Sequence, residues 1–144
     1  MIVSLYKGLI QLLYTNNSEH VEEVAESNGH NLQASGYDVA LKIVTYYEGL
    51  PQNEQENLLW RQLLKYGLAI GASLQTISPE YSRKELLARL RLSRKELREI
   101  VFLLRVLRDT SHLTAVDAEG LFSACENLSN ALIQTAKKIK QFSI

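Results

Sequence analysis

The stretch that decides the fold runs from Ser82 to Asp109 and reads SRKELLARLRLSRKELREIVFLLRVLRD. It opens with a serine followed three residues later by Glu85, the pattern of a capping box that begins a helix. Apolar or small side chains then recur every three or four residues, as the buried face of an α-helix requires. These seam positions are Leu86, Leu90, Ser93, Leu97, Ile100, Leu104 and Leu107. The stretch therefore predicts one long amphipathic helix.

Three further segments show the same periodicity. A helix is expected over residues 32–47, ended near Pro51, and another over residues 53–75. A fourth begins at Thr114, where Asp117 completes a second capping box. No segment alternates convincingly with the two-residue period of a strand. Helices of this length joined by short loops pack antiparallel, so we expect an all-α, up-down-up-down four-helix bundle.

The rest of the chain completes this picture. Residues 32–142 form the bundle, and residues 1–31 form an N-terminal extension in which residues 2–14 carry a short apolar helical stripe. A length of 144 residues suits a single domain, residues 1–144. No apolar run approaches the roughly 18 residues that a membrane span needs. The single Cys125 rules out an internal disulfide and fits a reducing compartment, so we expect a cytoplasmic protein.

Small residues crowd the second half of the helix expected over residues 53–75. Gly67 and Gly71 each cost about 1 kcal/mol of helix stability relative to alanine. We expect the close approach of a neighbouring helix to compensate for this cost.

The helix over residues 82–109 is also the basic part of a chain with zero net charge. Residues 82–108 hold nine basic and three acidic side chains, whereas residues 16–57 hold eight acidic side chains and one basic side chain. Four of the basic side chains recur every seven residues and follow one side of the helix. The candidate binding residues are this basic stripe, Lys84, Arg91, Arg98 and Arg105, together with Arg94 and Lys95.

Three interpretations of the basic stripe are open. A rigid row of arginines could follow the phosphates of a nucleic acid. It could also be a solvated face that pairs locally with Glu80, Glu85 and Glu99, or it could meet the acidic first half of another subunit. The zero net charge argues against indiscriminate nucleic-acid binding but not against a local site.

The same helix carries apolar side chains outside its seam. A helix in a monomeric bundle usually needs one apolar stripe, so a second set indicates contact with another subunit. The expected oligomer contacts are Leu87, Leu92, Phe102, Leu103 and Val106.

A repeat within the helix supports a different interpretation. The sequence SRKEL occurs at residues 82–86 and again at residues 93–97. If Ser93 capped a new helix, residues 85–94 would resemble a helix-turn-helix segment of a DNA-binding regulator. The turn of that motif usually holds a glycine, whereas Arg91 stands there in this chain. This interpretation requires a break in the helix near Arg91.

The sequence offers little for catalysis or for a bound metal or cofactor. His20, His30 and His112 are scattered, and no Glu-x-x-His pair of the di-iron type is present. Cys125 lies on the seam of the fourth helix, where a small buried hydrophobic residue is expected, and no base is implied beside it. We therefore expect a protein that is not an enzyme, with no catalytic residue, no metal and no cofactor.

The order of features from about residue 37 to residue 140 carries a family resemblance. An aromatic-rich first helix ends near Pro51, and the second contains RQLLK at 61–65 and AIGAS at 69–73. The third begins with SRKE and continues through SRKEL at 93–97, and the fourth carries regular leucines after Thr114. In this order the features resemble the small bacterial four-helix-bundle family encoded in intervening sequences of 23S ribosomal RNA genes. The family's Asn-Ile-Ala-Glu-Gly-like run is replaced here by LQTIS, residues 74–78.

The resemblance implies a closed ring of bundles, typically a pentamer, with a basic surface proposed to bind nucleic acid. A related branch, the accessory variability determinant of diversity-generating retroelements, is similar in layout and assists a reverse transcriptase through its template RNA. The partners that the resemblance implies are further copies of this chain, RNA or DNA, and a reverse transcriptase. Members of that branch are distinctly basic, whereas this chain is neutral.

We therefore predict a non-catalytic homo-oligomer that binds nucleic acid or a nucleoprotein partner through the helix over residues 82–109. The alternative is a protein-interaction or scaffold subunit with no nucleic-acid role.

Overall fold

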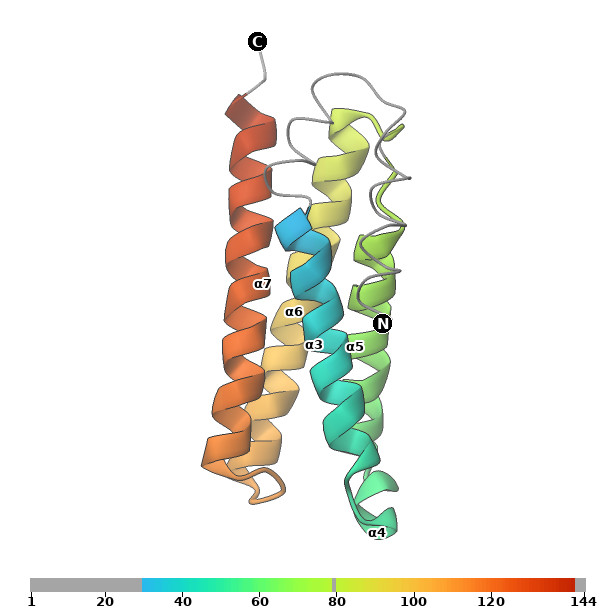
Figure 1. The fold of residues 1–144 in the computed structure, drawn as a ribbon, viewed down its shortest axis with the longest axis vertical. Helices are drawn as coiled ribbons and strands as arrows, with labels where there is room; N and C mark the ends of the chain where they lie inside the picture. The colour runs from blue at the N-terminus through green and yellow to red at the C-terminus, as the bar shows by residue number, and fades with distance from the viewer. Residues whose placement is uncertain (1–29, 79, 142–144) are drawn as a thin grey trace.

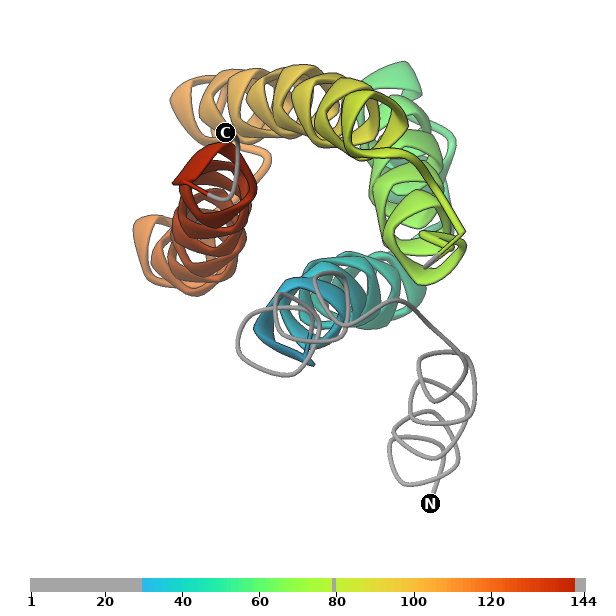
Figure 2. The ribbon, with the colours of Figure 1, turned by 90° about the horizontal axis from the view of Figure 1, so that it is seen from above.

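The computed structural model describes residues 30–78 and 80–141, and that part of the chain consists of helices and their connections, without strands (Figure 1). The four long helices follow one another in alternating directions. Seen along the bundle in Figure 2, α6 lies between α5 and α7 and opposite α3, which also contacts α5 and α7. The helices are α3 (His30–Glu48), α4 (Gln52–Gln55), α5 (Leu58–Gln75), α6 (Arg83–Asp109) and α7 (Ala115–Gln141). The predicted all-α, up-down-up-down four-helix bundle is confirmed, while residues 1–29 of the expected extension lie outside the described residues.

Helix α6 begins with the predicted capping box. The Ser82 hydroxyl oxygen accepts a hydrogen bond from the Glu85 amide at 3.2 Å, and the Glu85 carboxylate accepts one from the Ser82 amide at 2.9 Å. All seven predicted seam positions are buried. Helix α6 runs without a break over 27 residues, and Ser93 is fully buried in its interior. The helix-turn-helix interpretation is therefore wrong, because the chain does not turn at Arg91 and the seam continues past it.

The helix predicted over residues 53–75 is two helices. Asn57 lies between α4 and α5 and caps α5, its side-chain oxygen accepting a hydrogen bond from the Leu59 amide at 2.9 Å. Asparagine is among the strongest N-cap residues, and its cap separates the short turn from the long helix. Helix α4 is fastened to the end of α3, because Gln55 donates to the Tyr47 carbonyl oxygen and Tyr47 donates to the Gln55 carbonyl oxygen, both at 3.0 Å.

The expected close approach at the glycines of α5 is confirmed. A Cβ atom built on Gly71 would lie 2.9 Å from the Ala40 Cβ and 3.4 Å from the Gly36 carbonyl oxygen, both in α3. A Cβ atom on Gly67 would lie 2.8 Å from the Ile43 Cδ1. The missing side chains therefore let Ala40 and Ile43 of α3 pack directly against the backbone of α5.

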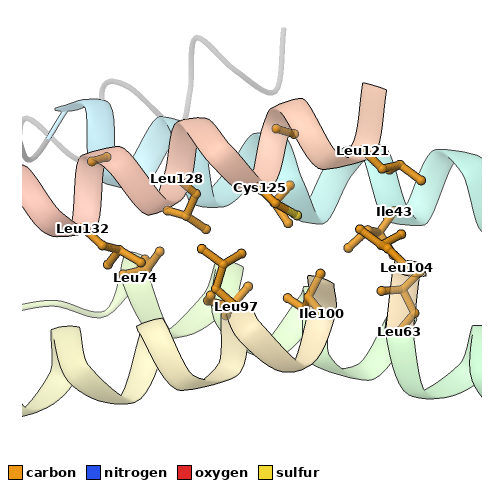
Figure 3. Packing of buried hydrophobic residues seen from close by; sticks show 14 of the residues in the cluster. Ile43, Leu63, Leu74, Leu97, Ile100, Leu104, Leu121, Cys125, Leu128 and Leu132 are labelled. Carbon is orange, nitrogen blue, oxygen red and sulfur yellow. The ribbon is translucent and has the colours of Figure 1, made fainter. Parts of the chain in front are cut away.

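The core fills the space between the four long helices. Figure 3 shows Cys125 and Leu128 of α7 facing Leu97 and Ile100 of α6, and all four side chains are buried. The prediction that Cys125 is a small buried residue is confirmed. Within the described residues, no helix is both long and apolar enough to cross a membrane.

A polar clasp closes the end of the bundle where α4 meets the connection between α6 and α7. The Trp60 indole donates to the Glu54 carboxylate at 3.1 Å, and the His112 Nδ1 lies 3.0 Å from the same oxygen. A carboxylate accepts hydrogen bonds, so Nδ1 carries the proton in this contact. Tyr46 stacks on Trp60 with ring centroids 5.3 Å apart and donates to Asp117 at 3.0 Å. The clasp thus joins α3, α4, α5, α7 and the α6–α7 connection.

Candidate nucleic-acid interface

Three of the nine basic side chains between residues 82 and 108 have structural contacts. Arg83 donates to the Ile139 carbonyl oxygen at 2.8 Å, near the end of α7. Arg89 donates to the Tyr81 hydroxyl at 3.3 Å. Arg108 pairs with Asp109 at 2.9 Å and lies 5.4 Å from the centroid of the Phe122 ring. These three arginines help to hold the ends and sides of α6 in place.

The other six basic side chains are exposed and form no hydrogen bond or ion pair within the described part of the chain. They are the six residues that the sequence predicts as binding residues, and they are called the cation face below: Lys84, Arg91, Arg94, Lys95, Arg98 and Arg105. At 3.6 residues per turn, they lie within an arc of roughly 100° around α6. From Lys84 to Arg105 the face extends about 32 Å along the helix.

Three of the four acidic side chains of α6 lie outside the arc of the cation face, and the fourth, Asp109, lies within that arc at the end of the helix and pairs with Arg108. At 3.6 residues per turn, Glu85, Glu96 and Glu99 fall outside its arc. Glu85 is engaged in the capping box, and neither Glu80 nor Glu99 forms an ion pair with a basic residue of α6 in the described residues. Within the described residues the predicted local ion pairs with Glu80, Glu85 and Glu99 are therefore absent, and the six cations are exposed to solvent.

One edge of the cation face borders a hollow between α6 and α7 with a volume of about 500 Å³. Its rim carries three basic side chains and one acidic side chain, and its floor is apolar. From α6 the lining residues are Arg94, Leu97, Arg98, Val101, Phe102 and Arg105, and from α7 they are Phe122, Cys125, Glu126 and Ser129. We call this feature the α6–α7 hollow. The sequence could not predict it, because its two walls are more than 15 residues apart along the chain and meet only through packing.

A second hollow of about 500 Å³ lies between the end of α3 and the start of α7, beside Tyr46 and Asp117. Its one basic side chain, Lys42, pairs with Asp38 at 3.1 Å. Among the described residues that line this hollow, no unpaired cation is present to attract an anionic partner.

The five predicted oligomer contacts do not form one stripe. Leu103 is 8% exposed and belongs to the core. Leu87 is partly buried and packs against that core. Val106 is half-buried, whereas Leu92 is 46% exposed and Phe102 is 63% exposed. Leu92 and Phe102 are about 15 Å apart along the helix and roughly 80° apart around it. Sequence reasoning also missed four exposed apolar side chains on the other helices, namely Leu41, Leu58, Leu68 and Val116.

Two groups near this region have shifted pKa values. Burial raises the pKa of the Cys125 thiol to about 12, so the thiol stays protonated at neutral pH and is a poor nucleophile. The pKa of the Glu96 carboxyl is raised, first by burial and second by the negative charge of Glu99. The positive charge of Arg89 partly offsets this rise. In the described residues, no three histidine, cysteine, aspartate or glutamate side chains are grouped so that they could hold a metal ion.

No protein-family model matches the sequence, and no curated protein matches it. A solved structure does resemble the fold. It is the crystal structure of a protein of unknown function from the S23 ribosomal protein family of Bacteroides thetaiotaomicron. The two chains superpose with a TM-score of 0.69 over 77% of this chain and 96% of that one, at 23% sequence identity. At this identity the likeness concerns the fold, and it agrees with the bundle that the sequence resemblance implies.

Proposed function

We propose that this protein is a non-catalytic, cytoplasmic homo-oligomer that binds nucleic acid, alone or within a nucleoprotein partner, through the cation face of α6. One observation carries the proposal: all six basic side chains of this face are exposed and unpaired within the described residues. Each of them can neutralise a phosphate and release a counterion, which favours binding at low salt. The resemblance adds RNA as a ligand and a reverse transcriptase as a partner.

The absence of a catalytic role is part of the proposal. Cys125 is buried with a pKa raised to about 12, and His112 is bound to Glu54 in the polar clasp. The buried thiol of Cys125 is not placed as an activated nucleophile, and within the described residues no hydrogen bond joins His112 to a serine, threonine or cysteine side chain that it could activate.

The proposal can be tested by measuring binding to fluorescent RNA and DNA oligonucleotides over a range of salt concentrations. The logarithm of the affinity should fall linearly with the logarithm of the salt concentration, with a slope of about 0.7 to 0.9 per neutralised phosphate. Replacing both Arg98 and Arg105 with glutamine should reduce that slope by about 1 to 2. A matched control replaces Arg61 and Lys65, exposed on α5, and should leave the slope unchanged.

A scaffold role is the competing function, and the exposed Phe102 within the cation face favours it. In that case the cations pair with acidic residues of other subunits. The triple variant Arg91→Glu, Arg98→Glu, Arg105→Glu separates the two functions. If it dissociates the oligomer, and the unmodified protein binds no nucleic acid, the scaffold function is correct.

A further inference from the structure

Phe102 is an exposed aromatic residue within the arc of the cation face, among basic side chains. Its ring is 63% exposed and so removes little apolar surface from water, which means that it contributes little to the stability of the bundle. Residues four positions before and three positions after a helical residue are its neighbours on the helix surface. For Phe102 these neighbours are Arg98 and Arg105. An exposed aromatic ring therefore lies between two guanidinium groups that form no hydrogen bond or ion pair within residues 30–78 and 80–141.

The ring also forms part of the wall of the α6–α7 hollow. Phe122 lines the same hollow from α7, and Arg108 lies over the Phe122 ring at 5.4 Å from its centroid. Arg94 adds a third basic side chain to the rim. At about 500 Å³, the hollow is in the size range of sites that hold small ligands or single ring systems.

We propose that the α6–α7 hollow binds single-stranded nucleic acid, with a base stacked on Phe102 and the adjoining phosphates paired with Arg98 and Arg105. This inference rests on the proposed function and names the form of nucleic acid that the cation face accepts. Aromatic rings interleaved with basic side chains bind single strands without regard to sequence, because every base has a face that can stack. In a duplex those faces are covered by neighbouring base pairs, so a ring fixed on a rigid helix has no base to stack on.

The side chains that line the hollow carry a net positive charge, which favours a nucleic-acid strand. The one acidic side chain among them, Glu126, provides an independent test. Glu126 lines the hollow from α7 and is exposed, against three arginines of α6. Its carboxylate repels a phosphate bound at the rim. Removing that charge by Glu126→Gln should therefore tighten the binding of single strands.

The experiment compares the full-length protein with its Phe102→Ala and Glu126→Gln variants by fluorescence anisotropy. The probes are a labelled 20-nucleotide oligo-U, an oligo-dT and a mixed-sequence DNA duplex of the same length. The unmodified protein should bind the single strands more tightly than the duplex. Phe102→Ala should weaken single-strand binding by about 5- to 150-fold, the effect of losing one stacked base, without changing the salt slope. Leu58→Ala is the matched control, because Leu58 is a similarly exposed apolar side chain at the start of α5.

Each other outcome has a distinct meaning. If single strands and duplex bind equally, and Phe102→Ala affects neither, the inference is overturned while the proposed function stands. If no probe binds at low salt, the proposed function falls and the inference falls with it. If Phe102→Ala changes the particle mass measured by light scattering, Phe102 is a subunit contact and the inference is overturned. Unequal affinities for oligo-U and oligo-dT, both weakened in Phe102→Ala, show which of the two strands is preferred and support the inference.

Discussion

At the scale of single residues, two glycines in helices have opposite surroundings. A Cβ atom at Gly71 would lie 2.9 Å from the Ala40 Cβ, which cannot rotate away, whereas a Cβ atom at Gly120 would meet nothing within 4 Å. Alanine is favoured over glycine in a helix by about 1 kcal/mol, and overpacking typically costs about 1 to 3 kcal/mol. Gly120→Ala should therefore raise the free energy of unfolding by up to about 1 kcal/mol, and Gly71→Ala should lower it by up to roughly 2 kcal/mol. Urea unfolding followed by circular dichroism measures both, and equal effects would contradict the close approach of α3 and α5.

Cys125 gives the stability a defined dependence on pH. Its pKa is raised to about 12 by burial, against about 8.5 for a free thiol. The folded state therefore holds the proton more tightly than the unfolded state, so this contribution to stability is complete below about pH 8.5 and is lost as the pH rises toward 12. The Tyr46 hydroxyl, whose pKa burial and Asp117 also raise to about 12, adds to the loss only above about pH 10.

The prediction is tested by comparing the protein with Cys125→Ala between pH 7 and pH 10. Below pH 8 the difference in unfolding free energy should be constant, because alanine leaves a small cavity but adds no titration. Above pH 8.5 the unmodified protein should lose up to about 1.4 kcal/mol per pH unit relative to the variant. A difference that stays constant up to pH 10, or rapid reaction of the native thiol with a disulfide reagent, would show that Cys125 is accessible.

At the scale of the elements, the sequence predicts features that follow from local side-chain spacing. It does not predict features that depend on how the helices pack against one another. The seam and the capping box of α6 follow from side-chain spacing, and the structure confirms both. The break at Asn57 was missed because the hydrophobic period continues across it, although an asparagine before an apolar run is a cap signal. Leu103 was assigned to a subunit contact because the period alone does not give the width of the buried face. The six cations that stay exposed on α6 could be predicted from their spacing, but the α6–α7 hollow could not, because it depends on the position of α7.

The polar clasp is the element-scale feature whose energy can be measured. His112 and Glu54 are 58 residues apart in sequence, and their side chains are only 32% and 28% exposed. His112→Ala and Glu54→Gln should each lower the free energy of unfolding by about 1 kcal/mol. Because the two side chains contact each other, the double variant should lose less than the sum of the two.

Trp60 provides an optical measure of the same clasp, since it is the single tryptophan of the chain and its indole donates to Glu54. Both substitutions should shift its fluorescence. Additive losses in stability, together with an unchanged Trp60 spectrum, would mean that the clasp does not hold the end of the bundle. Glu56→Gln is the control, because Glu56 is exposed and also lies next to α5.

At the scale of the whole molecule, the net charge is zero, but acidic and basic side chains are concentrated in two separate regions of the chain. The six exposed cations lie on one side of α6, whereas residues 16–57 carry eight acidic side chains and one basic side chain. Such a chain avoids strong indiscriminate attraction to polyanions while keeping one local basic face. In the proposed oligomer, this division would let the acidic region of one copy approach the basic region of the next, and the packing of the copies would then decide how much of the cation face stays open.

The proposed oligomer can be separated from the proposed ligand site by position around α6. If Phe102 binds nucleic acid, the remaining apolar residues of α6 that can contact another subunit are Leu92, which is 46% exposed, and the half-buried Val106. Both lie on the α5 side of the helix. Leu92→Glu should then reduce the mass measured by light scattering to that of a single 16.3 kDa chain, because a charge buried in an apolar contact is strongly unfavourable. Leu58→Glu, at a more exposed position on α5, is the control and should leave the mass unchanged. If the unmodified protein has the mass of a single chain, the oligomer is removed from the proposed function. If Leu92→Glu leaves the oligomer intact, the subunit contact lies elsewhere, and the exposed Leu41 of α3 and Leu68 of α5 are the next residues to test.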